Sequence, residues 1–396
     1  MQKEYDVAVI GAGPAGSCAA LFSSKGGATT VVVDRKSVIG EPVQCGEFIP
    51  SLEAMQRFLP EAGNIEKMYA LIPPDAIANR TKLVKFYSPN NKCFEFKFDG
   101  LVLNRNLLQQ FIVEKAVEHG AHVRTSCSAK AVVSKNGFKN ILVKEKVNSV
   151  LKAKALIGAD GFPSQTAAWV CMESNYGPRD MTLAIHKTMI NVESDENTVE
   201  MYTGTKYAPW GYAWIIPKSG KKANVGLGVR LSHFHLQRKG LMQFYFENFL
   251  RRHPVASKKL SKAKPLSLSA KIVPVGGRVK EVCKNGVVLV GDAAGLVTAT
   301  NGSGIPTAML SGCAAGNIAS MYTQGKCGLD VYEDYLKSEI DPVLRLSVTY
   351  RQVADIFFHS DLIFSWVLQL IGVRGVSKVI KCERLLKQRP TFQCFK

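Results

Sequence analysis

The 396-residue sequence has no internal repeat, no low-complexity linker and no apolar leader with a cleavage site before its first predicted strand. Without such a leader, we expect a cytosolic protein. The ten cysteines show neither the paired spacing of a metal site nor the density of a disulfide scaffold, so they predict reduced thiols and no metal. The apolar tail segment 356–371 contains His359 and Asp361 and is too short and too polar to predict a membrane span.

Acidic residues are scarce relative to basic ones. The chain has 51 Lys and Arg against 32 Asp and Glu, a net charge of +19. This excess predicts attraction to an anionic partner, and its sign alone does not choose between a nucleotide cofactor, a phospholipid surface and an acidic electron carrier. Residues 251–284 carry ten basic residues against Glu281 alone, which fits a solvated basic face and a headgroup-binding patch equally well. Because no nucleic-acid motif accompanies the charge, we expect no nucleic-acid partner.

Length and composition otherwise indicate a soluble folded protein. Hydrophobic residues make up 46% of the chain and charged residues 21%, which favours neither disorder nor a membrane-spanning fold. The chain is long enough for two domains, or for one nucleotide-binding domain interrupted by a smaller one.

The N-terminal segment reads as a βαβ unit. Residues 5–10 predict a strand, residues 11–16 (Gly-Ala-Gly-Pro-Ala-Gly) a turn and residues 19–25 a helix. A second β run, residues 30–33, ends at Asp34. This order is typical of a dinucleotide-binding fold.

The glycines of this unit have separate tasks. Gly11 permits the tight turn, Gly13 lets the backbone approach a pyrophosphate and Gly16 allows the helix to approach the strand. Asp34 can accept a hydrogen bond from a ribose hydroxyl. Alone, the fingerprint fits NAD as well as FAD.

Two later segments favour FAD. Residues 158–161 (Gly-Ala-Asp-Gly) end an apolar run, although an Asp-Gly pair is by itself typical of a turn. Residues 287–295 predict a buried strand that places Asp292 at the mouth of a glycine-rich loop, and residues 301–305 open a helix rich in small residues that we expect to pack against this strand. Asp292 can bind ribityl hydroxyls there, while the helix N-terminus faces the flavin ring.

The remaining pattern places β structure in the middle of the chain and helices at its end. Residues 83–98 predict a hairpin, and Asn104 can cap a helix that runs to about His119. Residues 182–229 predict an inserted sheet, and the chain from Tyr332 onward predicts helices.

These segments together resemble the p-hydroxybenzoate hydroxylase superfamily, and two more narrow the resemblance to the geranylgeranyl reductase family. Residues 40–47 (Gly-Glu-Pro-Val-Gln-Cys-Gly-Glu) are similar to its Pro-Val-x-Cys-Gly segment, and residues 209–217 (Pro-Trp-Gly-Tyr-Ala-Trp-Ile-Ile-Pro) to its Pro-x-Gly-Tyr-x-Trp-x-Phe-Pro motif. The resemblance covers residues 5–325. It departs at Thr298 and Ala299, where the family usually has Asn or Asp and then Pro.

The resemblance implies an α/β fold: a Rossmann-like FAD-binding domain with an inserted antiparallel β-sheet substrate domain and a helical C-terminal region. The expected division gives residues 1–80, 103–170 and 276–325 to the FAD-binding domain, the hairpin 81–102 and the sheet 171–275 to the substrate domain, and residues 326–396 to the helical region. The motifs and the resemblance together give as cofactor-binding residues Gly11, Gly13, Pro14, Ala15, Gly16, Asp34, Arg35, Cys45, Gly46, Arg105, Asp160, Gly161, Gly291, Asp292, Gly302, Ser303, Gly304 and Ile305.

The implied activity is saturation of the double bonds of a geranylgeranyl chain by reduced FAD, most simply in archaeal ether phospholipids. The protein must then lay the chain against the flavin and exclude water. Cys45, Tyr212 and Trp214 are the expected catalytic residues. Tyr212 and Trp214 project to one face of a strand, where they can wall a tunnel or belong to an ordinary sheet core. Cys45 matches the family cysteine that faces the flavin, or is a small buried residue.

The C-terminal region predicts either a core helix or a segment resting on an anionic membrane. Six basic residues follow the apolar tail, as expected beside lipid headgroups, although a solvated helix has the same pattern; they are Arg374, Lys378, Lys381, Arg384, Lys387 and Arg389. The external reductant stays open between ferredoxin and NADPH, because a basic surface suits an acidic ferredoxin and no second glycine fingerprint indicates an NADPH domain.

Three other classes share parts of this pattern. Residues 212–217 resemble the Trp-x-Trp-x-Ile-Pro motif of flavin halogenases, so a flavin monooxygenase or halogenase is the nearest alternative. A quinone oxidoreductase with an iron-sulfur cluster needs four late cysteines, and Cys382 and Cys394 cannot build one. A non-enzymatic prenyl-lipid carrier of the same fold has little reason to keep three flavin segments.

Overall fold

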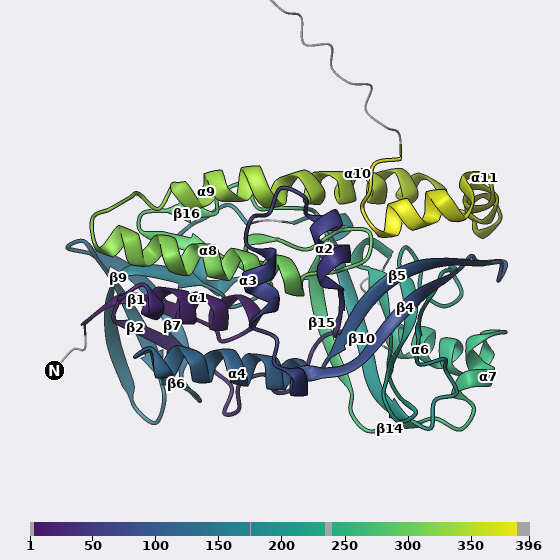
Figure 1. Cartoon of the computed structure of the whole chain (residues 1–396), viewed down its shortest axis with the longest axis horizontal. Coiled ribbons are helices and arrows are strands. Elements are labelled where there is room, and N and C mark those ends of the chain that lie inside the picture. The colour runs from purple at the N-terminus through teal and green to yellow at the C-terminus, as the bar shows by residue number, and fades with distance from the viewer. Residues whose placement is uncertain (1–3, 175, 234–239, 386–396) are drawn as a thin grey trace, which may run out of the picture.

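A computed structural model describes residues 4–174, 176–233 and 240–385, and two sheets organise this part of the chain (Figure 1). The first sheet has the order β16-β17-β9-β1-β2-β6, with the β7–β8 hairpin attached to β9, and its central strands are parallel. Its strands are β1 (Glu4–Ile10), β2 (Thr30–Val33), β6 (His122–Arg124), β7 (Ser128–Lys135), β8 (Phe138–Lys144), β9 (Asn148–Gly158), β16 (Cys283–Lys284) and β17 (Val287–Leu289). This is the expected nucleotide-binding arrangement.

The second sheet has the order β14-β10-β13-β12-β11-β4-β5-β3, with β15 also pairing β10. Its strands are β3 (Phe48–Pro50), β4 (Ile77–Tyr87), β5 (Cys93–Leu103), β10 (Met181–Ile190), β11 (Thr198–Tyr202), β12 (Tyr212–Lys218), β13 (Lys222–Arg230), β14 (Lys264–Pro265) and β15 (Ser269–Pro274). The expected antiparallel sheet is confirmed except that β4 and β11 run parallel. No hairpin joins these two strands, so nothing forces them to be antiparallel.

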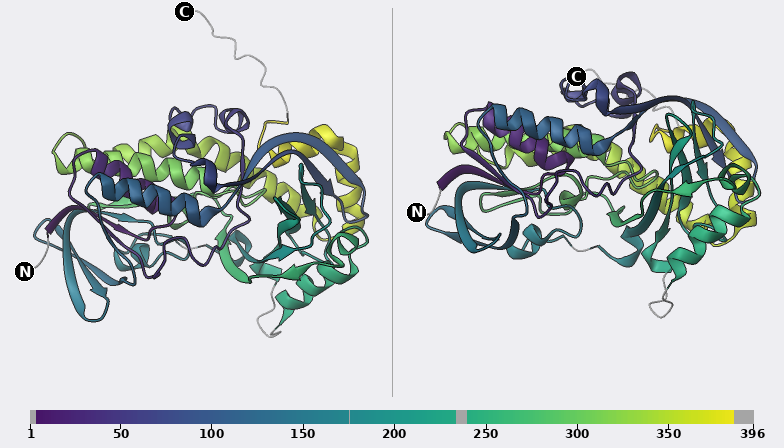
Figure 2. Two further views of the ribbon diagram at one scale, coloured as in Figure 1. Left: turned by 60° about the horizontal axis from the view of Figure 1, so that its bottom comes forward. Right: turned by 90° about the horizontal axis from the view of Figure 1, so that it is seen from below.

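Helices cover both sheets (Figure 2). They are α1 (Pro14–Lys25), α2 (Leu52–Phe58), α3 (Ile65–Tyr69), α4 (Arg105–Glu118), α5 (Gln165–Trp169), α6 (Leu241–Arg252), α7 (Ala256–Leu260), α8 (Ile305–Thr323), α9 (Val331–Tyr335), α10 (Asp341–Phe357) and α11 (Asp361–Ile380). Helices α1, α4 and α8 lie together on one side of the first sheet, and α9, α10 and α11 continue across to the second (Figure 1).

Two details of the predicted helices are wrong. Helix α1 begins at Pro14, five residues before the expected start, because the fingerprint itself forms the first turn with proline at its N-terminus. Asn104 stands at the N-cap of α4, but its side chain makes no capping bond in the described chain. Its amide oxygen instead accepts from Lys218, while Glu47 accepts from the first helical N–H, that of Arg105.

The small residues of α8 serve a different contact from the one expected. Added Cβ atoms at Gly312 and Gly316 would lie 2.1 Å from the carbonyl oxygen of Ala15 and 2.4 Å from that of Ala19. The closest approach of α8 is therefore to α1, not to the strand β17. Both helices begin at the carboxyl edge of the first sheet, where Pro14 and Ile305 line a common cavity.

The apolar tail segment 356–371 does not form one helix. Helix α10 ends at Phe357, and Ser360 caps α11 by accepting from the N–H of Ile363. Inside α11, Gly372 adopts φ 62° and ψ −174°, a conformation open only to glycine, which kinks the helix. The predicted basic residues Lys387 and Arg389, and Cys394, lie outside the described residues.

Acidic side chains pair with many of the basic residues of segment 251–284. Its members lie on several elements, and several are paired: Lys259 with Glu200, Lys262 with Glu193, Lys271 with Asp292, Arg278 with Asp341 and Lys284 with Glu281. Whether this segment binds an anionic headgroup stays a prediction.

Candidate active site

A cavity of about 1170 Å³ lies between the two sheets and extends under α10 and α11. One end is formed by the carboxyl edge of the first sheet and is rich in polar and charged groups. The other end is lined by apolar side chains of the second sheet and of the two C-terminal helices; among them are Val84, Phe86, Phe98, Val199, Met201, Ile216, Phe357, Phe364, Leu368, Ile371, Val376 and Ile380. A nucleotide cradle and an apolar tunnel thus form one continuous space.

Most predicted cofactor residues line this cavity. They are Gly11, Gly13, Pro14, Ala15, Asp34, Arg35, Cys45, Gly46, Arg105, Asp160, Gly161, Asp292, Gly302, Ser303, Gly304 and Ile305. Within the described chain, Gly16 and Gly291 stand behind it instead. A Cβ on Gly16 would lie 1.8 Å from the carbonyl oxygen of Gly11, so this glycine permits the close packing of α1 under the turn.

The polar end fits a dinucleotide. Apart from its two chain neighbours, no described residue has an atom within 4 Å of a Cβ built on Gly13, so this backbone faces open space at the N-terminus of α1. Asp34 accepts from the N–H groups of Ala12 (2.7 Å) and Lys36 (2.8 Å) and keeps lone pairs for a ribose hydroxyl. Burial and the nearby Arg105 lower the pKa of Lys36. In the described chain the Arg105 Nε is buried without a partner, as expected of a group that meets an anion.

Asp160 has local partners. Its carboxylate accepts from the Ser164 hydroxyl and the Thr166 N–H, each at 2.8 Å, at the start of α5. Burial raises the pKa of the carboxyl although these bonds oppose the rise. The residue lines the cavity and also stabilises its own turn.

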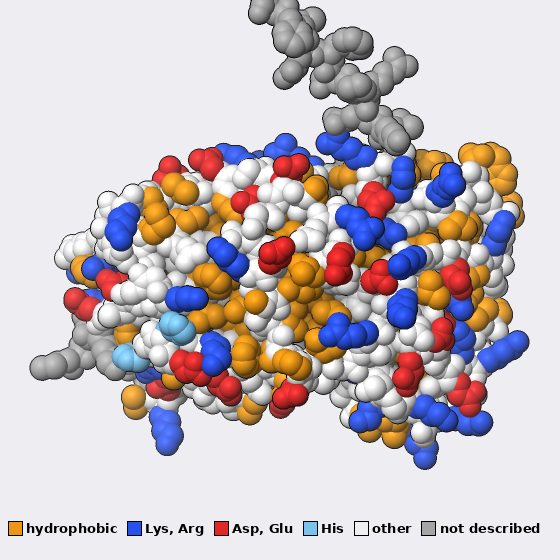
Figure 3. Space-filling view, in the orientation of Figure 1, with side chains coloured by type: hydrophobic (Ala, Val, Ile, Leu, Met, Phe, Trp, Pro, Cys, Tyr) orange, Lys and Arg blue, Asp and Glu red, His pale blue; other side chains and the backbone are white. Residues whose placement is uncertain are grey.

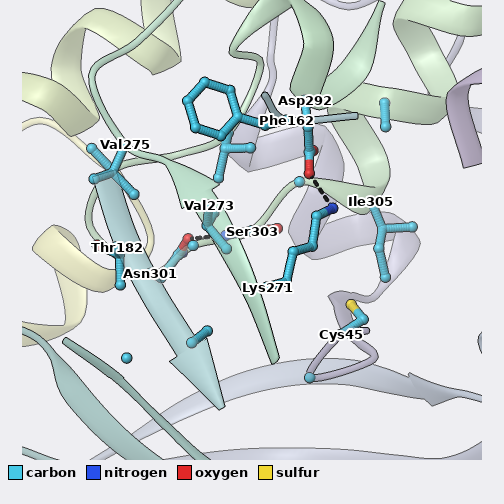
Figure 4. Close-up of a pocket in the computed structure, with 18 of the residues that line it drawn as sticks. Cys45, Phe162, Thr182, Lys271, Val273, Val275, Asp292, Asn301, Ser303 and Ile305 are labelled. Atoms are coloured by element: carbon cyan, nitrogen blue, oxygen red, sulfur yellow. Dashed lines mark hydrogen bonds and ion pairs between the residues drawn. The ribbon is translucent and has the colours of Figure 1, made fainter. Parts of the chain in front are cut away.

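Lys271 is the main charged residue of the site that the sequence did not indicate. It stands on β15 of the second sheet and reaches across the cavity to Asp292 on the first, with 2.6 Å between Nζ and Oδ2 (Figure 4). Burial raises the pKa of the Asp292 carboxyl, but Lys271 and Arg105 outweigh it and hold the pKa below its ordinary value. The pair ties the two sheets together where a flavin ribityl chain is expected.

The loop that carries Cys45 is held from behind by polar side chains. The Cys45 N–H donates to Nε2 of His186 (3.1 Å), and its carbonyl accepts from Asn224 (2.8 Å). The Trp214 indole N–H donates to the same Asn224 side chain (2.9 Å). The Cys45 sulfur accepts from the N–H of Glu47 (3.2 Å). His186 and Asn224 therefore fix the position of Cys45 at the cavity wall.

Glu47 joins this loop to α4. It is buried, has a φ of 66°, accepts from the Arg105 N–H and pairs with Lys218 at 2.6 Å. The cysteine motif contains Glu47, but sequence reasoning gave it no role, because its partners lie on elements distant in the chain.

His186 makes the stability of this region depend on pH. Burial, with Arg105 and Lys218 nearby, lowers its pKa to about 4, and burial alone does the same for His253. Because the unfolded value is about 6.5, the unfolded chain binds more protons between pH 6.5 and 4. Each histidine should therefore remove about 1.4 kcal/mol of unfolding free energy per pH unit as pH falls through this window.

The His186→Gln variant, which keeps an acceptor for Cys45, should lose about half of this pH dependence. Denaturant unfolding at pH 7 and pH 5 in excess FAD measures the difference, with exposed His119→Gln as the control. An unchanged slope in His186→Gln would contradict the assignment.

Tyr212 and Trp214 line the cavity from β12, and their ring centroids are 5.8 Å apart. The Tyr212 hydroxyl donates to the carbonyl of Asn301, and burial raises its pKa. Whether the two rings act on a substrate stays a prediction.

The loop that departs from the family pattern is held by its own contacts. The Asn301 side chain accepts from the Thr298 hydroxyl (2.5 Å) and the Ser303 N–H (2.9 Å), and donates to the carbonyl of Ile380 at the end of α11 (2.9 Å). The Ala299 N–H donates to Ser347 of α10. These bonds hold the loop in place, although it lacks the proline that the family pattern usually has at position 299.

Two buried arginines form a polar spot in the cavity wall. Arg230 and Arg351 line the cavity, and both donate to the carbonyl of Arg179. Asp355 lies 3.3 Å from Arg230, and Asp180 lies 3.0 Å from Arg351. This cluster joins β13 to α10.

Comparison with known proteins agrees with this geometry. The model for an FAD binding domain matches residues 6–45, and the model for the geranylgeranyl reductase catalytic domain matches residues 180–273. The two sheets and their shared cavity therefore define an FAD-binding flavoprotein.

Individual relatives narrow the class. The digeranylgeranylglycerophospholipid reductase of Methanocaldococcus jannaschii is 34% identical over 80% of this chain and 77% of its own length, and reductase 2 of Methanopyrus kandleri is 32% identical over 97% and 94%. The structure of a geranylgeranyl bacteriochlorophyll reductase-like protein from Thermoplasma acidophilum superposes with a TM-score of 0.83 at 27% identity, covering 96% of both chains. The chain belongs to the geranylgeranyl reductase family of FAD-dependent oxidoreductases.

Proposed function

We propose that this protein reduces the carbon–carbon double bonds of geranylgeranyl chains in an archaeal-type glycerophospholipid. The observation that carries the proposal is the continuous cavity, whose polar end suits FAD and whose apolar end suits a long prenyl chain. Relatives named as digeranylgeranylglycerophospholipid reductases support the choice of substrate.

The chain's own residues would divide the work between cofactor and lipid. The α1 N-terminus, Asp34 and Arg105 would hold the nucleotide, and Asp292 the ribityl hydroxyls. When bound and reduced, FAD supplies a hydride, and a proton completes the saturation of each double bond. The apolar wall excludes water and aligns the chain.

We propose that Cys45, Tyr212 and Trp214 contact the lipid or the cofactor where the two ends of the cavity meet. All three line the cavity, and the Cys45 backbone and the Trp214 indole share the same asparagine partner, Asn224. Asn224 therefore aligns Cys45 and Trp214 relative to each other. A structural role alone would leave substrate KM unchanged on conservative substitution, whereas contact with the chain should raise it.

Anaerobic turnover tests the proposed function. Dithionite-reduced, FAD-loaded protein is incubated with digeranylgeranylglycerophospholipid, and the lipid is analysed by mass spectrometry. Mass gains in steps of two hydrogens are expected. Unchanged lipid in this assay, together with oxygen- and halide-dependent halogenation of a substrate in a separate aerobic assay, would indicate a halogenase, and a colourless protein that binds prenyl lipid would indicate a carrier.

We propose that the protein works at the cytoplasmic face of the membrane, without spanning it, and takes electrons from an acidic carrier. A lipid substrate favours a location at the membrane. The net charge of +19 favours both an anionic membrane surface and an acidic electron carrier. The rate at which ferredoxin reduces the bound flavin should fall as the salt concentration rises. Reduction of the flavin by NADPH would contradict the proposed acidic electron carrier.

A further inference from the structure

Helix α11 carries an exposed apolar stripe. Leu362 is 82% exposed, Trp366 64% and Leu370 71%, and Ile363 and, beyond the kink at Gly372, Val373 are also exposed. The spacing of four residues from Leu362 to Trp366 to Leu370 places these side chains on one side of the helix. Ile356 of α10 is exposed nearby in the chain. Figure 3 shows hydrophobic side chains at the corner where Figure 1 labels α11, with lysine and arginine side chains beside them.

The opposite side of α11 belongs to the cavity. Phe364, Leu368 and Ile371 line it, and Phe364 and Leu368 are buried against the second sheet. The helix is thus a wall one helix thick, apolar on both sides. Such a surface on a monomeric soluble protein marks a contact with something apolar.

The shape of α11 argues against a membrane span. It is the one helix of the described chain that is long and apolar enough to cross a membrane by length and composition. The kink at Gly372 divides it, and residues 361–371 rise only about 16 Å against the ~30 Å of a hydrocarbon core. With one side packed on the protein, it can lie flat on a membrane but cannot cross it.

The charges beside the stripe favour an anionic surface. Between Asp361 and Leu385 the described chain carries Arg374, Lys378, Lys381 and Arg384 against two acids, Asp361 and Glu383. Arg374 and Arg384 are exposed. Basic residues flanking an apolar helix face are the pattern of interfacial helices on anionic lipid. The same charges would repel a second copy of this chain.

We propose that the α11 stripe is the docking face for an anionic lipid bilayer, and that prenyl chains enter the cavity beside this helix. The entry of substrate rests on the proposed reductase activity, whereas the docking does not. Docking places the thin α11 wall between the bilayer and the apolar end of the cavity, so that a chain leaving the bilayer passes from one apolar medium to another.

Flotation of the full FAD-loaded protein with vesicles tests the proposal. Vesicles of phosphatidylglycerol and phosphatidylcholine should bind the protein, and pure phosphatidylcholine should bind it less. The triple variant Leu362→Gln, Trp366→Gln, Leu370→Gln should bind at least about tenfold more weakly. The matched control Val133→Gln, Leu142→Gln, Val147→Gln, which replaces exposed apolar residues of β7, of β8 and of the turn between β8 and β9, should bind like the wild type. Flavin absorbance and thermal melting verify that each variant is folded.

Several outcomes overturn the docking. One is that the wild-type protein fails to float with the vesicles, and another is that the triple variant floats as well as the wild type. A third outcome is that light scattering finds the wild type to be a dimer and the triple variant a monomer, which would assign the stripe to self-association. The two proposals fail separately. If the triple variant loses vesicle binding but still reduces detergent-dispersed lipid, the docking and the reductase activity are both supported. If vesicle binding depends on the stripe but neither the wild type nor the triple variant reduces any lipid, only the proposed reductase activity is contradicted.

Discussion

Replacing Asp292 by alanine should weaken FAD binding by about a hundredfold or more. The carboxylate lies in the short 3-10 turn Gly291–Ala294 that follows β17, where ribityl hydroxyls are expected. Hydrogen bonds to a charged acceptor are worth roughly 1.5–3 kcal/mol each. Loss of two such bonds corresponds to a factor of roughly 100 to 20,000 in the dissociation constant. Removing the carboxylate also leaves the Lys271 ammonium without its partner in the described structure.

Fluorescence quenching of FAD by the apoprotein measures this effect. The control is Asp6→Ala, which removes a carboxylate of similar exposure that pairs with Lys154 at 2.8 Å, at the far end of β1. Retention of a wild-type dissociation constant by Asp292→Ala would show that this residue does not hold the cofactor. Apoprotein melting temperatures separate a binding defect from a folding defect.

Replacing Ala184 by tryptophan should reduce turnover of a twenty-carbon prenyl chain by about a hundredfold while FAD binding is retained. Ala184 lies on β10, lines the cavity and packs beside the apolar cluster of the second sheet. An indole there would fill tunnel volume, and misplacement of a reacting bond by about 1 Å costs on the order of 100-fold. Ten-carbon prenyl substrates, which need less of the tunnel, should lose less.

The control for this variant is Leu183→Trp, one residue earlier on the same strand. In the described structure Leu183 is not part of the cavity lining, so a bulky residue there should leave both chain lengths unaffected. Equal loss for long and short substrates in Ala184→Trp would indicate general damage to the site and contradict the tunnel assignment.

The polar end of the site could be predicted from sequence because its residues act through local backbone geometry. The turn at Gly11 and Gly13, the acid at Asp34 and the strand before Asp292 each belong to one continuous segment. A period-2 strand or a glycine turn is visible in such a segment.

The support of the site could not be predicted. Lys271 meets Asp292, and His186 and Asn224 meet Cys45, only because the second sheet folds over the first. No local pattern distinguishes these side chains from ordinary strand residues. The same holds for α11: its composition showed an apolar segment, but only the packed structure shows which side is exposed.

The parallel pairing of β4 with β11 has a consequence for how the protein folds during synthesis. Leu83 pairs with Thr198, and Tyr87 with Tyr202, so the β4–β5 hairpin leaves the ribosome long before its neighbour exists. Closing so long a loop is slow, and until it closes the apolar faces of the hairpin are exposed to solvent. We expect nascent chains halted before residue 198 to aggregate or to recruit chaperones, and the second sheet to close only when β11 has been made.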